Sequence, residues 1–157
     1  MRLAKLLTLL VLASLVTVSC SSDDSGDGGE NQSAELVGSW QLVEMNISQA
    51  IDTNDDGSTS TNLLTEVDCL RDAITINPSG DWSSTGVFPA LISPITGNLY
   101  NVTCSTVINR SGNWQFSGSS LFLSGDFQAT FLFSGNRLTL AIGNELPGLQ
   151  SLVYEKQ

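Results

Sequence analysis

The sequence predicts an all-β fold, a small antiparallel meander β-barrel of eight to nine short strands, preceded by a signal peptide and a flexible tether. Apolar and polar residues alternate in short runs such as "YNVTCSTVI" (100–108) and "FQATFLF" (127–133), and this period of two is that of half-buried strands. Turn residues separate the runs, and no window has a convincing helical period. Short consecutive strands with one apolar face close most simply into a barrel.

The strands follow one another closely along the chain. "NPSG" (77–80) has proline and glycine where a type I turn favours them, and "SGSS" (117–120) and "SGN" (134–136) are short enough for hairpins. The segment 87–98 is expected to form a long apolar loop. Strands are predicted near residues 38–47, 72–77, 81–86, 100–109, 112–117, 120–124, 127–133, 137–142 and 150–156.

Residues 1–19 have the pattern of a signal peptide. Arg2 and Lys5 provide a basic start, and the apolar run from Leu6 to Val18 has 13 residues. This run is shorter than the roughly 20 residues that cross a bilayer as a helix. The chain behind it is therefore expected to be exported.

"VTVSC" (16–20) resembles a bacterial lipobox, and this resemblance implies that Cys20 is acylated and becomes the mature N-terminus. The following stretch, "SSDDSGDGGENQS", resembles the start of surface lipoproteins of Gram-negative bacteria. The resemblance implies an outer-membrane protein, exposed at the cell surface and held to the membrane by acyl chains on Cys20. The alternative is an ordinary signal peptide that leaves Cys20 as a thiol.

Composition divides the exported chain into two parts. Residues 20–35 contain almost no apolar side chains, so they are expected to form a flexible tether, and residues 36–157 are enough for one domain. Without residues 1–19 the chain has four basic and sixteen acidic residues, a formal net charge of −12. Nucleic acids and anionic lipid headgroups are therefore disfavoured as partners.

Two cysteines remain if Cys20 carries lipid. Cys69 and Cys104 are then a pair in an oxidising compartment, and a structural disulfide is the expected assignment. Two buried free thiols are the alternative.

Several motifs occur in an ordered series along residues 36–157: "LVGSWQLVEM", the acidic "DTNDDG", "CLRDAITINPSGDW", "SGNW", "FSGNRLTL" and "YEK". The series resembles the lipocalin-like domain of bacterial surface lipoproteins. The resemblance implies that Gly38 and Trp40 close the bottom of the barrel. It also implies a small ligand, an apolar molecule or a glycan fragment, in the barrel mouth.

Aromatic residues are the candidates for lining such a mouth, although core packing is the alternative for each of them. The candidate ligand-binding residues are Trp82, Tyr100, Trp114, Phe116, Phe127 and Phe131.

The acidic loop after the first strand resembles the start of an EF-hand calcium loop. Gly57 stands at the sixth place, but Leu63 stands where the bidentate glutamate is required, so Glu66 or Asp68 would have to replace it. A solvated turn is the alternative. The candidate ligands of a weak structural Ca²⁺ site are Asp52, Asn54, Asp56 and Ser58.

An enzyme is not expected. The chain has no histidine, which removes imidazole bases and zinc ligands, and carboxylate pairs such as Asp68 and Asp72 are more simply explained as solvated surface groups. Two functions remain: a surface protein that binds a small ligand, or an envelope protein with a solid core that meets an unknown partner through its outer surface.

Overall fold

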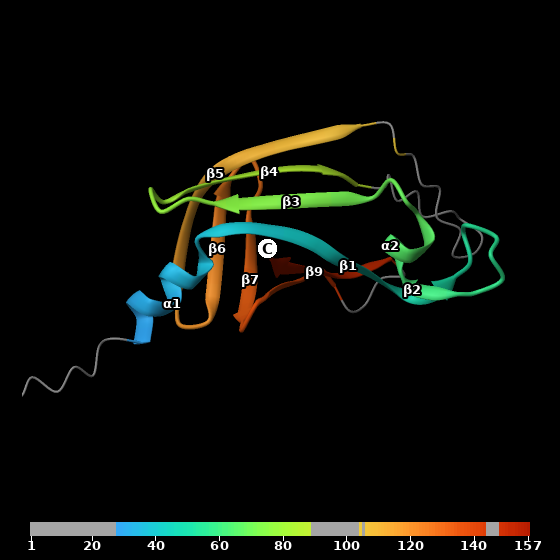
Figure 1. The fold of residues 1–157 in the computed structure, drawn as a ribbon, viewed down its shortest axis with the longest axis horizontal. Coiled ribbons are helices and arrows are strands. Elements are labelled where there is room, and N and C mark those ends of the chain that lie inside the picture. The colour runs from blue at the N-terminus through green and yellow to red at the C-terminus, as the bar shows by residue number, and fades with distance from the viewer. Residues whose placement is uncertain (1–27, 89–103, 105, 144–147) are drawn as a thin grey trace, which may run out of the picture.

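The computed structural model describes residues 28–88, 104, 106–143 and 148–157. Residues 1–19, Cys20 and Tyr100 lie outside this part of the chain. Within it, nine antiparallel strands form one sheet that curves around a common core (Figure 1). The strands are β1 (Gly38–Ile51), β2 (Ser60–Asn62), β3 (Arg71–Ile76), β4 (Asp81–Val87), β5 (Val107–Ser117), β6 (Ser120–Gly125), β7 (Ala129–Ser134), β8 (Arg137–Ala141) and β9 (Leu149–Lys156).

The sheet closes because β1 pairs with the last strand, β9, in addition to its pairings with β2 and β3. One edge of β1 pairs with β9, from Trp40 opposite Lys156 to Ile47 opposite Leu149. Its other edge pairs first with β3 and then with β2, and the β1–β2 pairing has a register shift between Asn46 and Ile51. Strands β1 and β3 to β9 therefore form a closed eight-stranded barrel, and β2 is an additional strand. The predicted antiparallel meander barrel is confirmed.

β5 differs from the prediction, because a single strand runs from Val107 to Ser117 where two strands with a break at 110–111 were expected. Gly112 of "NRSGN" lies inside this strand, packed closely against β6. A Cβ atom on Gly112 would lie 1.7 Å from the carbonyl oxygen of Ser124 and 2.9 Å from Nε1 of Trp82. Glycine here permits the close approach of β6 and is not a turn residue.

Two short helices were also not predicted. α1 (Gly28–Leu36) lies in the second half of the expected tether, and α2 (Leu63–Glu66) follows β2. Asn62 caps α2 by accepting a hydrogen bond from the Leu64 amide (3.1 Å). The same side chain also accepts from the Met45 amide (2.9 Å) and donates to the Val43 carbonyl (3.2 Å), so it fixes α2 against β1.

α1 ends against the barrel wall, where strand residues satisfy its terminal carbonyl groups. Nε1 of Trp40 donates to the Leu36 carbonyl (2.8 Å), and Nζ of Lys156 donates to that of Glu35. These groups are otherwise without a partner at a helix C-terminus. Gly38 then turns the chain into β1 with a φ of +136°, a conformation that favours glycine.

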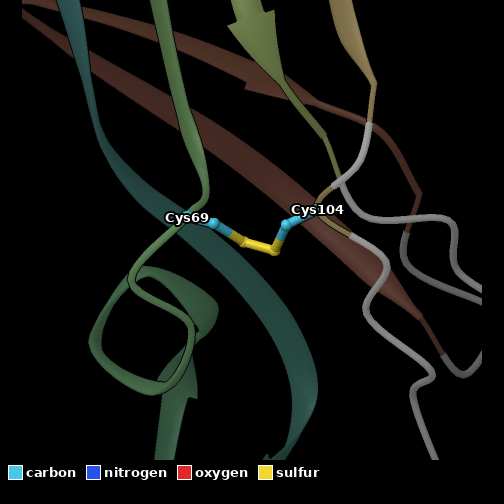
Figure 2. The surroundings of a disulfide bond; sticks show 2 residues. All are labelled: Cys69 and Cys104. Carbon is cyan, nitrogen blue, oxygen red and sulfur yellow. A yellow bond between two sulfur atoms is a disulfide. The ribbon is translucent and has the colours of Figure 1, made fainter.

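Cys69 and Cys104 form a disulfide, as predicted (Figure 2). Their Cα atoms are 5.9 Å apart, within the usual range for this bond. Cys69 precedes β3 and Cys104 precedes β5, and the register places Arg71, Val87 and Val107 side by side. The bond therefore joins two segments at the end of the barrel where β3 and β5 begin.

Candidate functional site

The two ends of the barrel differ in how side chains fill them. At the end where β1 begins, the Trp40 indole is fully buried and meets the Phe133 ring edge to face, with centroids 6.0 Å apart. Phe116 contacts Phe133 in the same way at 5.9 Å. The fully buried Leu36 of α1 adds to this cluster. We call this end the packed end.

A cavity of about 340 Å³ lies at the opposite end, which we call the open end. Its walls come from the end of β4, the start of β5, the β6–β7 connection and the facing ends of β8 and β9. Most of the lining is apolar, and Arg110 and Gln128 are its polar members. The larger side chains of the lining include Phe88, Arg110, Phe127, Leu140, Leu149 and Leu152.

Among the described residues that line this cavity, Arg110 is the charged one. Inward and outward residues alternate along β5, and Arg110 is on the same half-buried face as Trp114 and Phe116. Its guanidinium carbon lies 4.8 Å from the centre of the Phe88 ring and 4.9 Å from that of Phe127. Both aromatic rings thus hold the cation by cation–π contacts at the cavity wall.

A buried acid lies near the start of β3, at the same end of the barrel. Asp72 of β3 is 2% exposed, so it is not the solvated surface group that the sequence predicted. The Tyr154 hydroxyl donates a hydrogen bond to its Oδ2 (2.7 Å), whereas its Oδ1 has no partner among the described residues. Burial raises the pKa of Asp72, and the Tyr154 hydrogen bond and the charge of Arg110 oppose that rise. Burial and the nearby Asp72 raise the pKa of Tyr154.

Tyr100 lies outside the described residues, and of the five other aromatic residues predicted to line the mouth only Phe127 is found in the cavity wall. Phe131 is fully buried and meets the Tyr154 ring edge to face at 5.7 Å. Trp82 is buried and donates from Nε1 to the Ser124 carbonyl (3.0 Å). Trp114 donates to the Asn77 carbonyl (2.8 Å), and Phe116 belongs to the packed end.

Sequence reasoning missed Arg110 and Asp72, and also Phe88, which lines the cavity together with Arg110. A signal for the first two was present. Arg110 is an even number of residues from Trp114 and Phe116, so all three lie on the same face of their strand. Asp72 likewise shares a strand face with Ile74 and Ile76. A charged residue at an inward position of a strand is unusual and often functional.

The acidic loop lies beyond β1 at the open end and is held by hydrogen bonds of its own. The Gly57 amide donates to Oδ2 of Asp52 (3.0 Å), and the Ser58 amide donates to Oδ1 of Asp56 (2.7 Å). The hydrogen bond from Ser58, followed by the one from Asn54, lowers the pKa of Asp56. Such turns suit a polar loop as well as a cation site.

One carboxylate from outside this loop reaches it. The buried Glu66 of α2 accepts a hydrogen bond from the Thr53 amide at Oε2 (3.0 Å). Oδ1 of Asp52 is a buried oxygen with no partner among the described residues. No group of three or more Asp, Glu, Cys or His side chains placed to hold a metal occurs in the described part of the chain.

Comparisons with protein-family models, with curated proteins and with solved structures find no significant match to this chain. Among the residues that the structure describes, no helix is long and apolar enough to cross a membrane.

Proposed function

We propose that this chain is a lipid-anchored surface lipoprotein with a lipocalin-like barrel that binds a small, largely apolar molecule at its open end. The observation that carries the proposal is the cavity of about 340 Å³ between β4, β5, β8 and β9. This volume is within the range of about 300 to 1,000 Å³ typical of small-molecule sites. The anchor on Cys20 would place the site outside the membrane.

The chemistry of the lining favours an apolar molecule over a glycan fragment. Recognition of a sugar requires several hydrogen-bonding groups, because each buried hydroxyl needs a partner. Leu140, Leu149 and Leu152 instead provide aliphatic surface, and Phe127 adds an aromatic wall. Burying such surface from water is the main source of affinity for an apolar ligand.

The alternative is an envelope protein that acts through its outer surface. Phe122 of β6 and Leu132 of β7 support it, because they are outward-facing apolar side chains with 42% and 54% of their surface exposed. That alternative was expected to have a barrel core filled throughout. The cavity at the open end makes the ligand-binding function the better supported of the two.

A cavity-filling substitution tests the proposal. Ala129 lines the cavity, and the next residue, Thr130, points outward from the same strand. Calorimetric titration of apolar ligands into the Cys20→Ala form avoids competition from the protein's own acyl chains. We expect binding to wild-type barrel, loss of binding in Ala129→Phe and unchanged binding in Thr130→Phe. Equal binding by both variants would place the ligand elsewhere.

A further inference from the structure

Arg110 is placed where an unpaired charge is costly. It is half-buried on the inner face of β5 and belongs to the cavity wall. The other cations of the mature chain are differently placed. Arg137 pairs with Glu44 and Glu155 on the outer surface, Lys156 binds the end of α1, and Arg71 is exposed at the start of β3.

The ring contacts of Arg110 cover the faces of its guanidinium, and among the described residues its N–H edges have no hydrogen-bond or ion-pair partner. Phe88 and Phe127 hold the guanidinium carbon at 4.8 and 4.9 Å from their ring centres. Within the described residues, no carboxylate lies within ion-pair distance of Arg110, and no hydrogen bond from its N–H groups is found. Asp72 interacts with it through charge alone.

A carboxylate is the acceptor that fits these edges. A guanidinium presents pairs of parallel N–H donors in one plane, which match the two oxygens of a carboxylate. A ligand carboxylate at the cavity wall would receive these donors without disturbing either ring contact. A cationic headgroup would meet Arg110 with like charge, and no carboxylate of the described chain lines the cavity to receive it.

Resting on the proposed function, we propose that the ligand is a single-chain amphiphile whose carboxylate binds the edge of Arg110 while its tail packs on Leu140, Leu149 and Leu152. The cavity of about 340 Å³ sets the size of the tail. At about 30 Å³ for each methylene-sized group, close to the volume of a water molecule in the liquid, it holds a chain of about ten carbons.

Calorimetry on the Cys20→Ala form with three ten-carbon probes tests this inference. The probes are decanoate, the uncharged 1-decanol and decyltrimethylammonium, each at neutral pH and below its micelle concentration. We expect decanoate to bind most tightly. Arg110→Gln should weaken decanoate binding by about ten- to a hundredfold, the loss typical of charge-assisted hydrogen bonds, and leave decanol binding unchanged.

Two further variants make the result specific. Arg110→Lys keeps the charge without the planar pair of donors, so its affinity for decanoate should lie between those of wild type and Arg110→Gln. Arg71→Gln removes an exposed arginine and should bind decanoate like wild type. Thermal melting of each variant verifies that the barrel remains folded.

The outcomes separate this inference from the proposed function. Equal affinity for decanoate and decanol, unaffected by Arg110→Gln, would leave an apolar binding site in place and overturn the assignment of the carboxylate. Tighter binding of decyltrimethylammonium would also overturn it. Absence of binding by all three probes would contradict the proposed function itself.

Discussion

The Tyr154 hydroxyl donates a 2.7 Å hydrogen bond to the Asp72 carboxyl group, which joins β9 to β3 across the interior of the barrel. The other carboxyl oxygen of Asp72 packs against Gly86, where a Cβ atom would approach it to 2.3 Å. The pair therefore depends on a glycine in the neighbouring strand. Because Asp72 is buried, its ionisation makes the stability of the barrel depend on pH.

We predict that Asp72 makes the barrel less stable as pH rises. Its folded-state pKa is raised above 3.8, chiefly by burial, so the folded state keeps this proton to higher pH than the unfolded state does. The stability from this group is fully present below pH 3.8 and is lost as pH rises through the folded pKa. Urea unfolding at several pH values should show Asp72→Asn gaining stability relative to wild type as pH rises.

The exposed Asp81 provides a control of opposite sign. Hydrogen bonds from Ser79 and Asn77 lower its pKa, so its contribution is present at neutral pH and is lost on acidification. Asp81→Asn should therefore lose stability relative to wild type as pH rises. A difference between Asp72→Asn and wild type that does not change with pH would contradict the first prediction.

Gly112→Ala should destabilise the barrel by about 3 kcal/mol, because the added methyl group would overlap the Ser124 carbonyl and β6 would have to move away. Denaturant unfolding gives this free energy directly. Gly143→Ala is the matched control, since nothing lies within 4 Å of a Cβ atom there. If both variants unfold like wild type, Gly112 is not needed for the approach of β5 and β6.

Removing the disulfide should lower the free energy of unfolding by about 4 kcal/mol on the chain-entropy estimate, because the bond spans 35 residues. The double variant Cys69→Ser and Cys104→Ser, compared with its parent in denaturant titrations, measures this loss. Mass spectrometry of unreduced peptides from the parent should recover Cys69 and Cys104 as one linked pair. Recovery of both as free thiols would contradict the prediction.

We predict a weak calcium site in the acidic loop, with Asp52, Asn54, Asp56 and Ser58 as ligands. Exported modules use calcium sites with dissociation constants of about 0.1 to 1 mM, so calcium at about 5 mM should raise the melting temperature relative to chelator. Asp52→Ala should remove this rise. Asp55→Asn is the control, because it removes a charge from the same loop and asparagine tolerates its φ of 58°. An equal rise in both variants would identify a non-specific ionic effect.

Cys20 should carry the acyl chains. Cells expressing the wild-type chain in a lipoprotein-processing bacterium should incorporate labelled palmitate into it, whereas the Cys20→Ala chain should remain unlabelled. Cys69→Ala should be labelled like wild type, since that residue belongs to the disulfide. Equal labelling of wild type and Cys20→Ala would remove the basis for a lipid anchor.

The alternation of apolar residues was sufficient to predict the barrel but not the location of its cavity. The period of two shows which residues of β5 face inward, and it places Arg110, Trp114 and Phe116 on one face. It does not show how far along the barrel each one lies relative to the other strands. That position depends on the register, which brings Phe116 to the packed end beside Phe133 and leaves Arg110 at the open end.

The packing role of Gly112 also could not be predicted from the local sequence. In "NRSGN" the turn-forming composition favoured a break, whereas Gly112 lies within β5 and leaves room for the Ser124 carbonyl of the neighbouring strand β6. The helix α1 was missed for a similar reason. Its last carbonyl groups are satisfied by Trp40 and Lys156, and the second of these is 121 residues away from its acceptor.

The pairing of β1 with β9 affects how readily copies of the protein aggregate through strand edges. An open sheet ends in strands whose unpaired N–H and C=O groups can recruit another chain and start aggregation. Here the first and last barrel strands satisfy each other from Trp40 to Ile47, and the extra strand β2 has only three residues. Copies of the protein at high local concentration would therefore collide without joining through these barrel strands.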